Sequence, residues 1–225
     1  MLDGRKYLAI GFDMDNTLLR TDVNYPKLSK VAYCEMKMAG VPDCAISEKE
    51  TYRFNLENGV DYLKKNGRTD DVNKVLKQIR ERLKEIEMEN VKTARPFEGA
   101  VDMLMYLKSK GYLVGVLTKG SRAYAIKALT VSGVIDMLDV LVCRDDHDES
   151  ETKPSPIAMM HLADSLNVEL KDILYIGDHK IDYICARDSG ADFIGVLSRY
   201  TKEEWDLIGN DIYVTDTVAD LMKIL

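Results

Sequence analysis

Two acidic residues separated by one position, Asp13 and Asp15, follow directly on a short apolar run at residues 7–12. The run has the composition of a strand that is buried on both faces, as in a parallel sheet. If the chain stays extended, both carboxylates project to the same side, at the carboxyl end of a strand, where open parallel sheets bind their ligands. Asp is also common in turns and at helix N-caps, so the pair alone leaves a ligand site and a turn equally open.

A hydroxyl and two lysines occur at comparable places farther along the chain. Thr118 and Lys119 follow the apolar run 112–117 and precede a predicted helix. A helix start with a nearby hydroxyl can bind an anion, although a hydroxyl residue before a helix is more often a plain N-cap. Lys153 is held by the rigid Pro154 just outside another predicted helix, and a solvated lysine is the simpler interpretation of that position.

A second pair of acids, Asp178 and Asp182, follows the apolar run 173–176. Residues four apart lie on one side of a helical turn, so the two carboxylates can act together. Capping of the following helix by Asp178 alone is the structural alternative.

The elements that must position these side chains are six apolar runs separated by segments with helical periodicity. The runs cover residues 7–12, 112–117, 140–143, 173–176, 193–196 and 212–214. An alternation of this kind predicts the α/β class, with a doubly wound parallel sheet and helices on both of its faces.

The stretch 21–95 interrupts the alternation, because it shows helical patterns and no convincing strand. The patterns span residues 27–39, 47–65 and 70–90. Ser47 and Glu50 are predicted to form a capping box at the start of the second helix. Residues 21–95 carry 15 basic and 13 acidic groups, whereas the rest of the chain carries 16 and 25. We therefore expect an all-helical domain over 21–95, inserted into an α/β core over 1–20 and 96–225.

Composition limits the class of protein. The chain has 225 residues, 46% of them hydrophobic, which suits one globular domain with an insertion. Its 31 basic and 38 acidic residues give a net charge of −7, which argues against a general nucleic-acid or membrane binder. The four cysteines are widely spaced, so a reducing, cytoplasmic location is expected. Asp3, Arg5 and Lys6 interrupt the N-terminal segment, and we expect neither a signal peptide nor a membrane span.

The motifs occur in a fixed order: an acid pair, a hydroxyl, a lysine and a second acid pair, three of the four at carboxyl ends of predicted strands. This ordered set resembles the haloacid dehalogenase (HAD) superfamily, and the resemblance covers the whole chain. The helical insertion lies between the first and second motifs, as in the branch of the superfamily that carries a helical cap there. The resemblance implies a HAD-like Rossmannoid core with a helical cap domain, most similar in layout to the phosphoglycolate phosphatases.

The resemblance implies a role for each motif residue. Asp13 is similar to the nucleophile that attacks phosphorus to give an aspartyl-phosphate. Asp15 is similar to the general acid that protonates the leaving alcohol and then activates water as a base. Thr118 matches the hydroxyl that binds a phosphoryl oxygen, and Lys153 matches the cation that holds Asp13 and the transferring group together.

The resemblance also implies Mg²⁺ as the cofactor. Its ligands would be Asp13, Asp178 and the backbone carbonyl of Asp15, an oxygen-only set that suits a hard cation. Asp182 is similar to the second acid of this motif, which supports the metal site through Lys153 or a bound water.

Several alternatives remain open within this resemblance. Dehalogenases lack the second acid, so Asp15 favours phosphoryl chemistry, but sugar-phosphate mutases keep both acids. Many relatives have Asn where this chain has Lys119, a residue that either contacts the substrate phosphate or caps a loop. A phosphorylatable, non-catalytic binding scaffold is disfavoured, because every expected site residue is present. We expect a Mg²⁺-dependent phosphomonoester hydrolase that acts on a small phosphorylated metabolite, as a monomer or homodimer.

One further feature precedes Lys153. Five acidic residues between positions 145 and 151 surround His147. Such a loop is able to bind a cation, but a solvated loop is the simpler interpretation and is the one expected here.

Overall fold

The computed structural model describes residues 7–210 and 212–225. The chain divides into two compact units, which we call the sheet unit (Met1–Asp22 and Val91–Leu225) and the helical unit (Val23–Asn90). Asp3, Arg5 and Lys6, on which the expectation about the N-terminal segment partly rests, lie outside the described residues. Among the helices of the described ranges, none combines the length and apolar character that a membrane span requires.

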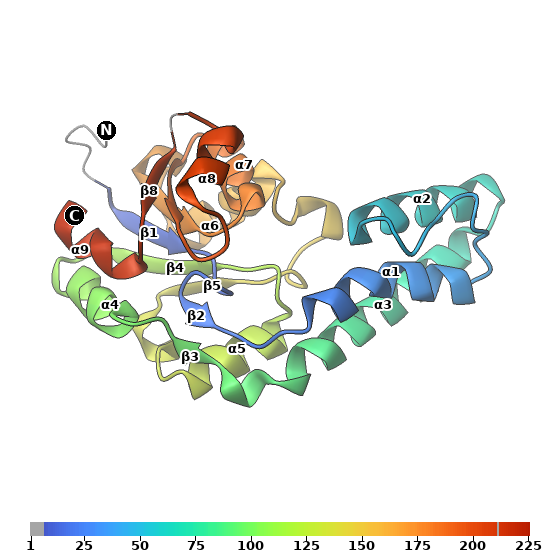
Figure 1. Ribbon diagram of the computed structural model, residues 1–225, viewed down its shortest axis with the longest axis horizontal. Coiled ribbons are helices and arrows are strands. Elements are labelled where there is room, and N and C mark those ends of the chain that lie inside the picture. Colours follow the sequence, from blue (N-terminus) through green and yellow to red (C-terminus); the bar gives the residue numbers. More distant parts are fainter. Residues whose placement is uncertain (1–6, 211) are drawn as a thin grey trace. The chain divides into compact units, whose positions relative to one another are not determined.

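The sheet unit is built on six parallel strands in the order β5-β4-β1-β6-β7-β8 (Figure 1). The strands are β1 (Ala9–Phe12), β4 (Leu113–Leu117), β5 (Val140–Val142), β6 (Ile173–Gly177), β7 (Asp192–Val196) and β8 (Tyr213–Thr215). Each of the six apolar runs found in the sequence overlaps one of these strands. The predicted parallel sheet is therefore confirmed, and the inner strands β1 and β6 are buried along their whole length.

Helices cover both faces of this sheet (Figure 1). One face carries α6 (Pro156–Leu166), α7 (Lys180–Ser189) and α8 (Lys202–Ile208), and the other carries α4 (Ala100–Ser109) and α5 (Arg122–Val131), with the short α9 (Leu221–Ile224) beside α4. Gly11 and Gly115 lie in register on β1 and β4 beneath Leu162 of α6. A Cβ atom at either glycine would lie within 2.9 Å of that leucine side chain, so the two glycines allow α6 to approach the sheet closely.

The segments that leave and re-enter the sheet unit pair as a short antiparallel ribbon of β2 (Leu19–Arg20) and β3 (Arg95–Pro96). Two residues per strand carry no readable periodicity, and the sequence did not predict this ribbon. The guanidinium of Arg20 lies 4.8 Å from the centroid of the Phe97 ring. The ribbon holds the two connections to the helical unit next to each other.

The helical unit consists of three helices, α1 (Tyr25–Met38), α2 (Tyr52–Lys65) and α3 (Thr69–Glu89). Their apolar faces share one core, whose buried members include Val31, Met36, Leu63, Val75 and Ile79. Three helices were predicted from the periodicity over this stretch, and three are present.

The predicted start of the second helix is wrong. α2 is capped by Thr51, whose hydroxyl accepts a hydrogen bond from Phe54 N at 3.1 Å. Ser47 instead lies in a turn, where its backbone N–H donates to Asn55 Oδ1 (2.8 Å) and its carbonyl accepts from Asn55 Nδ2 (2.9 Å). This contact with the buried Asn55 keeps the segment before Thr51 out of the helix, so Ser47 and Glu50 form no capping box there.

Candidate active site

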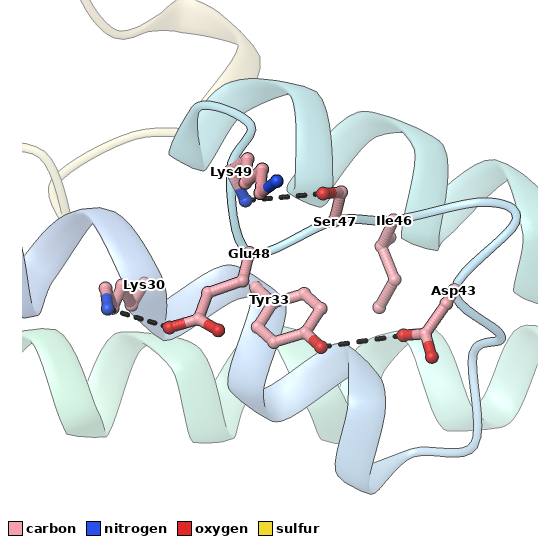
Figure 2. A pocket seen from close by; sticks show the side chains of 7 residues that line it. All are labelled: Lys30, Tyr33, Asp43, Ile46, Ser47, Glu48 and Lys49. Atoms are coloured by element: carbon pink, nitrogen blue, oxygen red, sulfur yellow. Dashed lines mark hydrogen bonds and ion pairs between the residues drawn. The ribbon is translucent and has the colours of Figure 1, made fainter.

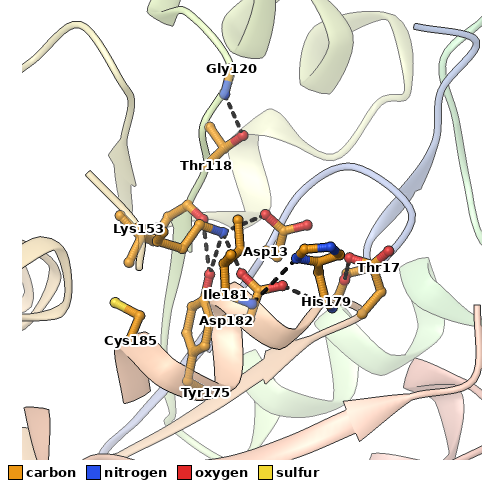
Figure 3. Close-up of polar contacts among 12 residues, drawn as sticks. Asp13, Thr17, Thr118, Gly120, Lys153, Tyr175, His179, Ile181, Asp182 and Cys185 are labelled. Atoms are coloured by element: carbon orange, nitrogen blue, oxygen red, sulfur yellow. Dashed lines mark hydrogen bonds and ion pairs between the residues drawn. The ribbon is translucent and has the colours of Figure 1, made fainter. Parts of the chain in front are cut away.

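Lys153 is the centre of a buried polar cluster at the carboxyl ends of β1 and β6 (Figure 3). Its ammonium nitrogen donates to Asp13 Oδ1 (2.6 Å), Asp182 Oδ1 (2.7 Å) and Tyr175 OH (2.9 Å). Only 2% of Lys153 is exposed, and the three acceptors match the three protons of the ammonium group. Burial of the charge is tolerated because two carboxylates compensate it. The solvated lysine that the local sequence allowed is therefore excluded by the structure.

The acids of this cluster follow two neighbouring strands. Asp13 comes directly after β1, and Asp178 comes directly after β6. One carboxylate oxygen from each of Asp13, Asp178 and Asp182 lies within 4.8 Å of the other two. Asp13 and Asp182 are separated by about 170 residues in the sequence, and the pairing of adjacent parallel strands brings the three acids together.

The two later acids are used differently. Asp182 accepts from Lys153 through Oδ1 and from the backbone N–H of His179 through Oδ2 (3.1 Å). The second contact is part of a capping box in which His179 is the N-cap of α7. The alternative interpretation from the sequence, that Asp178 caps this helix, is therefore wrong. Asp178 Oδ2 is buried, lies 3.3 Å from Arg199 Nε and makes no hydrogen bond among the described residues. Asp178 therefore offers an oxygen to a cation, whereas both oxygens of Asp182 are already engaged.

The titration behaviour of the cluster reflects burial first and the excess of negative charge second. Burial raises the pKa of Asp13 to about 6, although Lys153 opposes the shift. Burial, reinforced by Asp13 and Asp182, raises the pKa of Asp178 to about 8. Burial lowers the pKa of Lys153, but the two neighbouring carboxylates outweigh it and hold that pKa well above its ordinary value. An oxygen-only donor set with surplus negative charge fits a hard divalent cation such as Mg²⁺.

Asp15 lies in a different setting from Asp13. The chain does not stay extended through the pair, because β1 ends at Phe12 and a turn follows in which Asn16 has a φ of 62°. Asp15 Oδ1 accepts hydrogen bonds from the hydroxyls of Tyr124 and Thr21, both at 2.6 Å. Two hydroxyl donors fix the orientation of this carboxylate, which a group that exchanges protons requires.

The loop after β4 carries the predicted hydroxyl and the unusual lysine. Thr118 is buried, and its Oγ1 accepts a hydrogen bond from Gly120 N at 2.9 Å. Lys119 is half-buried, and its carbonyl accepts from Arg144 Nη1 at 2.8 Å. Burial and nearby positive charges, Lys119 among them, lower the pKa of His179 to about 4. The structure thus places both residues in the loop that follows β4, the strand next to β1, and Arg144 donates a hydrogen bond to that loop.

Two tyrosines complete the site and were not identified as site residues from the sequence. Tyr175 accepts from Lys153 and donates to the carbonyl of Leu117 at 2.9 Å, and Tyr124 donates to Asp15. In the sequence, Tyr175 stands within an apolar strand run and Tyr124 within a helix, where a core role suffices. The one feature that could have indicated a site role is that both residues are tyrosine and not phenylalanine, because a tyrosine hydroxyl that becomes buried needs a hydrogen-bond partner.

A separate hollow of about 400 Å³ lies in the helical unit (Figure 2). Its polar side chains largely pair with one another: Lys30 donates to Glu48 at 2.7 Å, and Tyr33 OH lies 3.5 Å from Asp43 Oδ1. Because its charges are balanced internally, the hollow presents no concentrated charge to a ligand.

The comparisons with known proteins agree with this geometry. Residues 10–196 match the model of the haloacid dehalogenase-like hydrolase family. A phosphoglycolate phosphatase of Haemophilus influenzae is 24% identical over 98% of this chain and 99% of its own. A provisionally assigned phosphoglycolate phosphatase of Haemophilus somnus superposes with a TM-score of 0.64 at 22% identity, over 98% of this chain and 99% of that one. A provisionally assigned beta-phosphoglucomutase of Thermotoga maritima gives 0.61 at 19% identity, over 96% and 97%.

The chain therefore belongs to the haloacid dehalogenase-like hydrolase family. Within the superfamily it is an enzyme of the phosphatase type. The resemblance that the ordered motifs indicated is confirmed, and so is the α/β fold class.

Proposed function

We propose that this chain is a Mg²⁺-dependent phosphomonoester hydrolase that acts through an aspartyl-phosphate on Asp13. The observation that carries the proposal is the buried contact between Lys153 and Asp13, made at the carboxyl end of a central strand beside Asp178. A carboxylate is a weak nucleophile toward a phosphate dianion, and this arrangement supplies the positive charge that such an attack needs.

In the first half-reaction, a carboxylate oxygen of Asp13 forms a bond to phosphorus while the bond from phosphorus to the ester oxygen breaks. Asp15 gives its proton to that oxygen, so the leaving group departs as an alcohol. Lys153 stabilises the charge on Asp13 and on the transferring group, and Thr118 donates its hydroxyl to a phosphoryl oxygen. Lys119 is proposed as a further contact to the substrate phosphate.

In the second half-reaction, Asp15 takes a proton from water, and the water oxygen bonds to phosphorus as the acyl phosphate bond to Asp13 breaks. Inorganic phosphate leaves, and Asp13 is regenerated. Asp13, Asp178 and the carbonyl of Asp15 would hold Mg²⁺, which, when bound, reduces the repulsion between the two anions that react. Asp182 positions Lys153 and does not contact the substrate.

We further propose that the helical unit serves as a cap that encloses the substrate and excludes water. An enclosed site favours a small phosphorylated metabolite. A curated relative that matches nearly the whole chain is named as a phosphoglycolate phosphatase, which makes 2-phosphoglycolate the first compound to test. The substrate class proposed is thus a small phosphomonoester, with that compound as its leading member.

The proposal is tested by phosphate release from 2-phosphoglycolate, other small phosphomonoesters and an aryl phosphate, each with Mg²⁺ and with EDTA. The native chain should release phosphate only with the metal, and Asp13→Asn should reduce turnover by about 10³-fold or more. The matched control is Asp164→Asn, the same change at an exposed position on α6, which should keep native activity.

The covalent step has its own measurement. Acid-quenched mass spectrometry of the native chain during turnover should detect one phosphoryl group on the peptide that contains Asp13. Phosphate release that persists in Asp13→Asn would contradict the nucleophile assignment. Transfer to a second sugar hydroxyl in place of water would favour the mutase alternative.

A further inference from the structure

Two of the three histidines in the chain lie together outside the site described above. His161 Nε2 lies 2.9 Å from Glu151 Oε2, and the ring of His147 stacks on that of His161 with centroids 3.5 Å apart. One ligand atom from each of these three side chains lies within 4.8 Å of the other two. We call His147, Glu151 and His161 the histidine cluster.

We propose that the histidine cluster is a second metal site, which binds a divalent transition-metal ion of the Zn²⁺ type. Two imidazole nitrogens and one carboxylate oxygen are a ligand set that such ions accept, with a water in the fourth position. The catalytic acids offer only oxygen and suit Mg²⁺, so the two sites differ in the metal that they prefer.

The fold brings the three ligands together from separate elements. His147 lies in the loop after β5, Glu151 ends a 3₁₀ turn at Glu149–Glu151, and His161 lies on α6. The two rings are parallel within 6°, so their lone pairs do not yet converge, and a bound ion requires rotation of one ring. His147 is exposed and lies in a loop, and it is therefore the ring that is able to turn.

The surroundings favour a cation. The same loop contains Asp145, Asp148 and Glu149 in addition to Glu151, while Asp146 pairs with Arg122. The local field is therefore negative, which increases the attraction for a divalent ion. The sequence indicated the acidic loop but not the site, because His161 lies 14 positions after His147 and joins it only through the folding of α6.

A metal ion at the histidine cluster would have a structural consequence for the enzyme. The cluster joins the loop that precedes Lys153 to the helix that follows it. A bound ion would cross-link the two sides of the segment that positions this lysine. The expected effect is a higher thermal stability of the metal-loaded chain and a stiffer loop.

The test uses the full chain, freed of metal by a chelator that is then removed, and Zn²⁺ as the probe. Long-range ¹H–¹⁵N NMR resolves imidazole nitrogens, and the chain has three histidines. Zn²⁺ should shift the signals of His147 and His161 together, with one saturation point, and leave His179 unaffected. Shifts confined to His179 would place Zn²⁺ near the catalytic carboxylates, and no imidazole shift would show that the histidine cluster does not bind it; either result would overturn the proposal.

Variants make the test specific. His161→Gln keeps a side chain that can bond to Glu151 but should weaken Zn²⁺ binding at His147 by about tenfold or more. Asp164→Asn, one helical turn further along α6, removes an exposed and solvent-screened negative charge without removing a ligand, so its affinity should stay within about twofold of native. Native affinity in His161→Gln would overturn the proposal. If that variant does not fold, Co²⁺ added to the native chain decides: the intense visible d–d bands of four-coordinate Co²⁺ support the site, and only the weak bands of an octahedral all-oxygen site overturn it.

Discussion

Lys153 contacts two carboxylates and the hydroxyl of Tyr175, and the hydroxyl can be removed while both carboxylates stay in place. Tyr175→Phe should lower kcat about fivefold, because Lys153 loses one of three acceptors and the Leu117 carbonyl loses its donor, a change worth about 1 kcal/mol. KM should change little, since the hydroxyl positions the lysine and does not contact the substrate. Steady-state kinetics on the best phosphomonoester measures both constants.

The matched control for this prediction is Tyr106→Phe. Tyr106 lies on α4, where its ring contacts Lys110, and loss of its hydroxyl should leave kcat within about twofold of native. Native kcat in Tyr175→Phe would show that the two carboxylates alone position Lys153.

The sequence predicted the motif residues better than the residues that support them. Asp13 and Asp178 could be selected because each follows an apolar run, and Lys153 and Asp182 because the motifs occur in a recognisable order. Tyr124 meets Asp15 across 109 positions, and no local pattern connects a helix residue with a loop so far away. Such partners depend on how helices pack on the sheet, which periodicity alone does not determine.

At the scale of the element, the buried Asn55 controls where α2 begins. Asn55→Ala should lower the free energy of unfolding by about 2 kcal/mol, because the half-buried Ser47 N–H would lose its acceptor and the Ser47 carbonyl would keep only the bond from Glu50 N. Asn58→Ala is the matched control on the same helix. Asn58 is exposed and, among the described residues, donates to Phe54 O alone, so this change should cost well under about 1 kcal/mol. Urea denaturation compares the two, and equal losses would contradict a role for Asn55 in holding the turn.

The helices and their starts were not equally predictable. Apolar periodicity extends over many residues and indicated all three helices of the helical unit. The start of α2 depends on a bond between Ser47 and a side chain eight positions later. Ser47 and Glu50 have the spacing of a capping box, but the contact between Ser47 and Asn55 is incompatible with a helix that begins at Ser47.

For the whole molecule, the alternation of runs and helical patterns predicted the class of fold, but not the order of the strands. β1 pairs with β4 and β6, which follow it by roughly 100 and 160 residues, and the β1–β6 pairing brings Asp13, Asp178 and Asp182 together. Order and register arise from packing between distant segments. The family resemblance implied that the motif residues act together in one site, but it was not used to predict the strand order.

The charge surplus of the site should affect the stability of the whole protein in the absence of metal. The pKa of Asp178 is raised to about 8 from an ordinary value of 3.8, so the folded chain holds this proton more tightly than the unfolded chain. The free energy of unfolding should therefore decrease as the pH rises between these two values, with Asp13 contributing up to about pH 6. From about pH 5 to pH 8 we expect a loss of about 1 kcal/mol or more, measured by urea denaturation in EDTA.

Metal and mutation should each remove this pH dependence. Saturating Mg²⁺ binds the folded, deprotonated site and should raise stability most at high pH, where the metal-free chain is weakest. Asp178→Asn removes the proton-binding group, so the metal-free variant should exceed the native chain in stability at pH 8 and should respond little to Mg²⁺. Asp164→Asn, at its exposed position, should retain the native slope and the native response. If Asp178→Asn keeps the native decline with pH, the surplus charge resides on other groups, and Asp178 is not the residue whose ionisation Mg²⁺ stabilises.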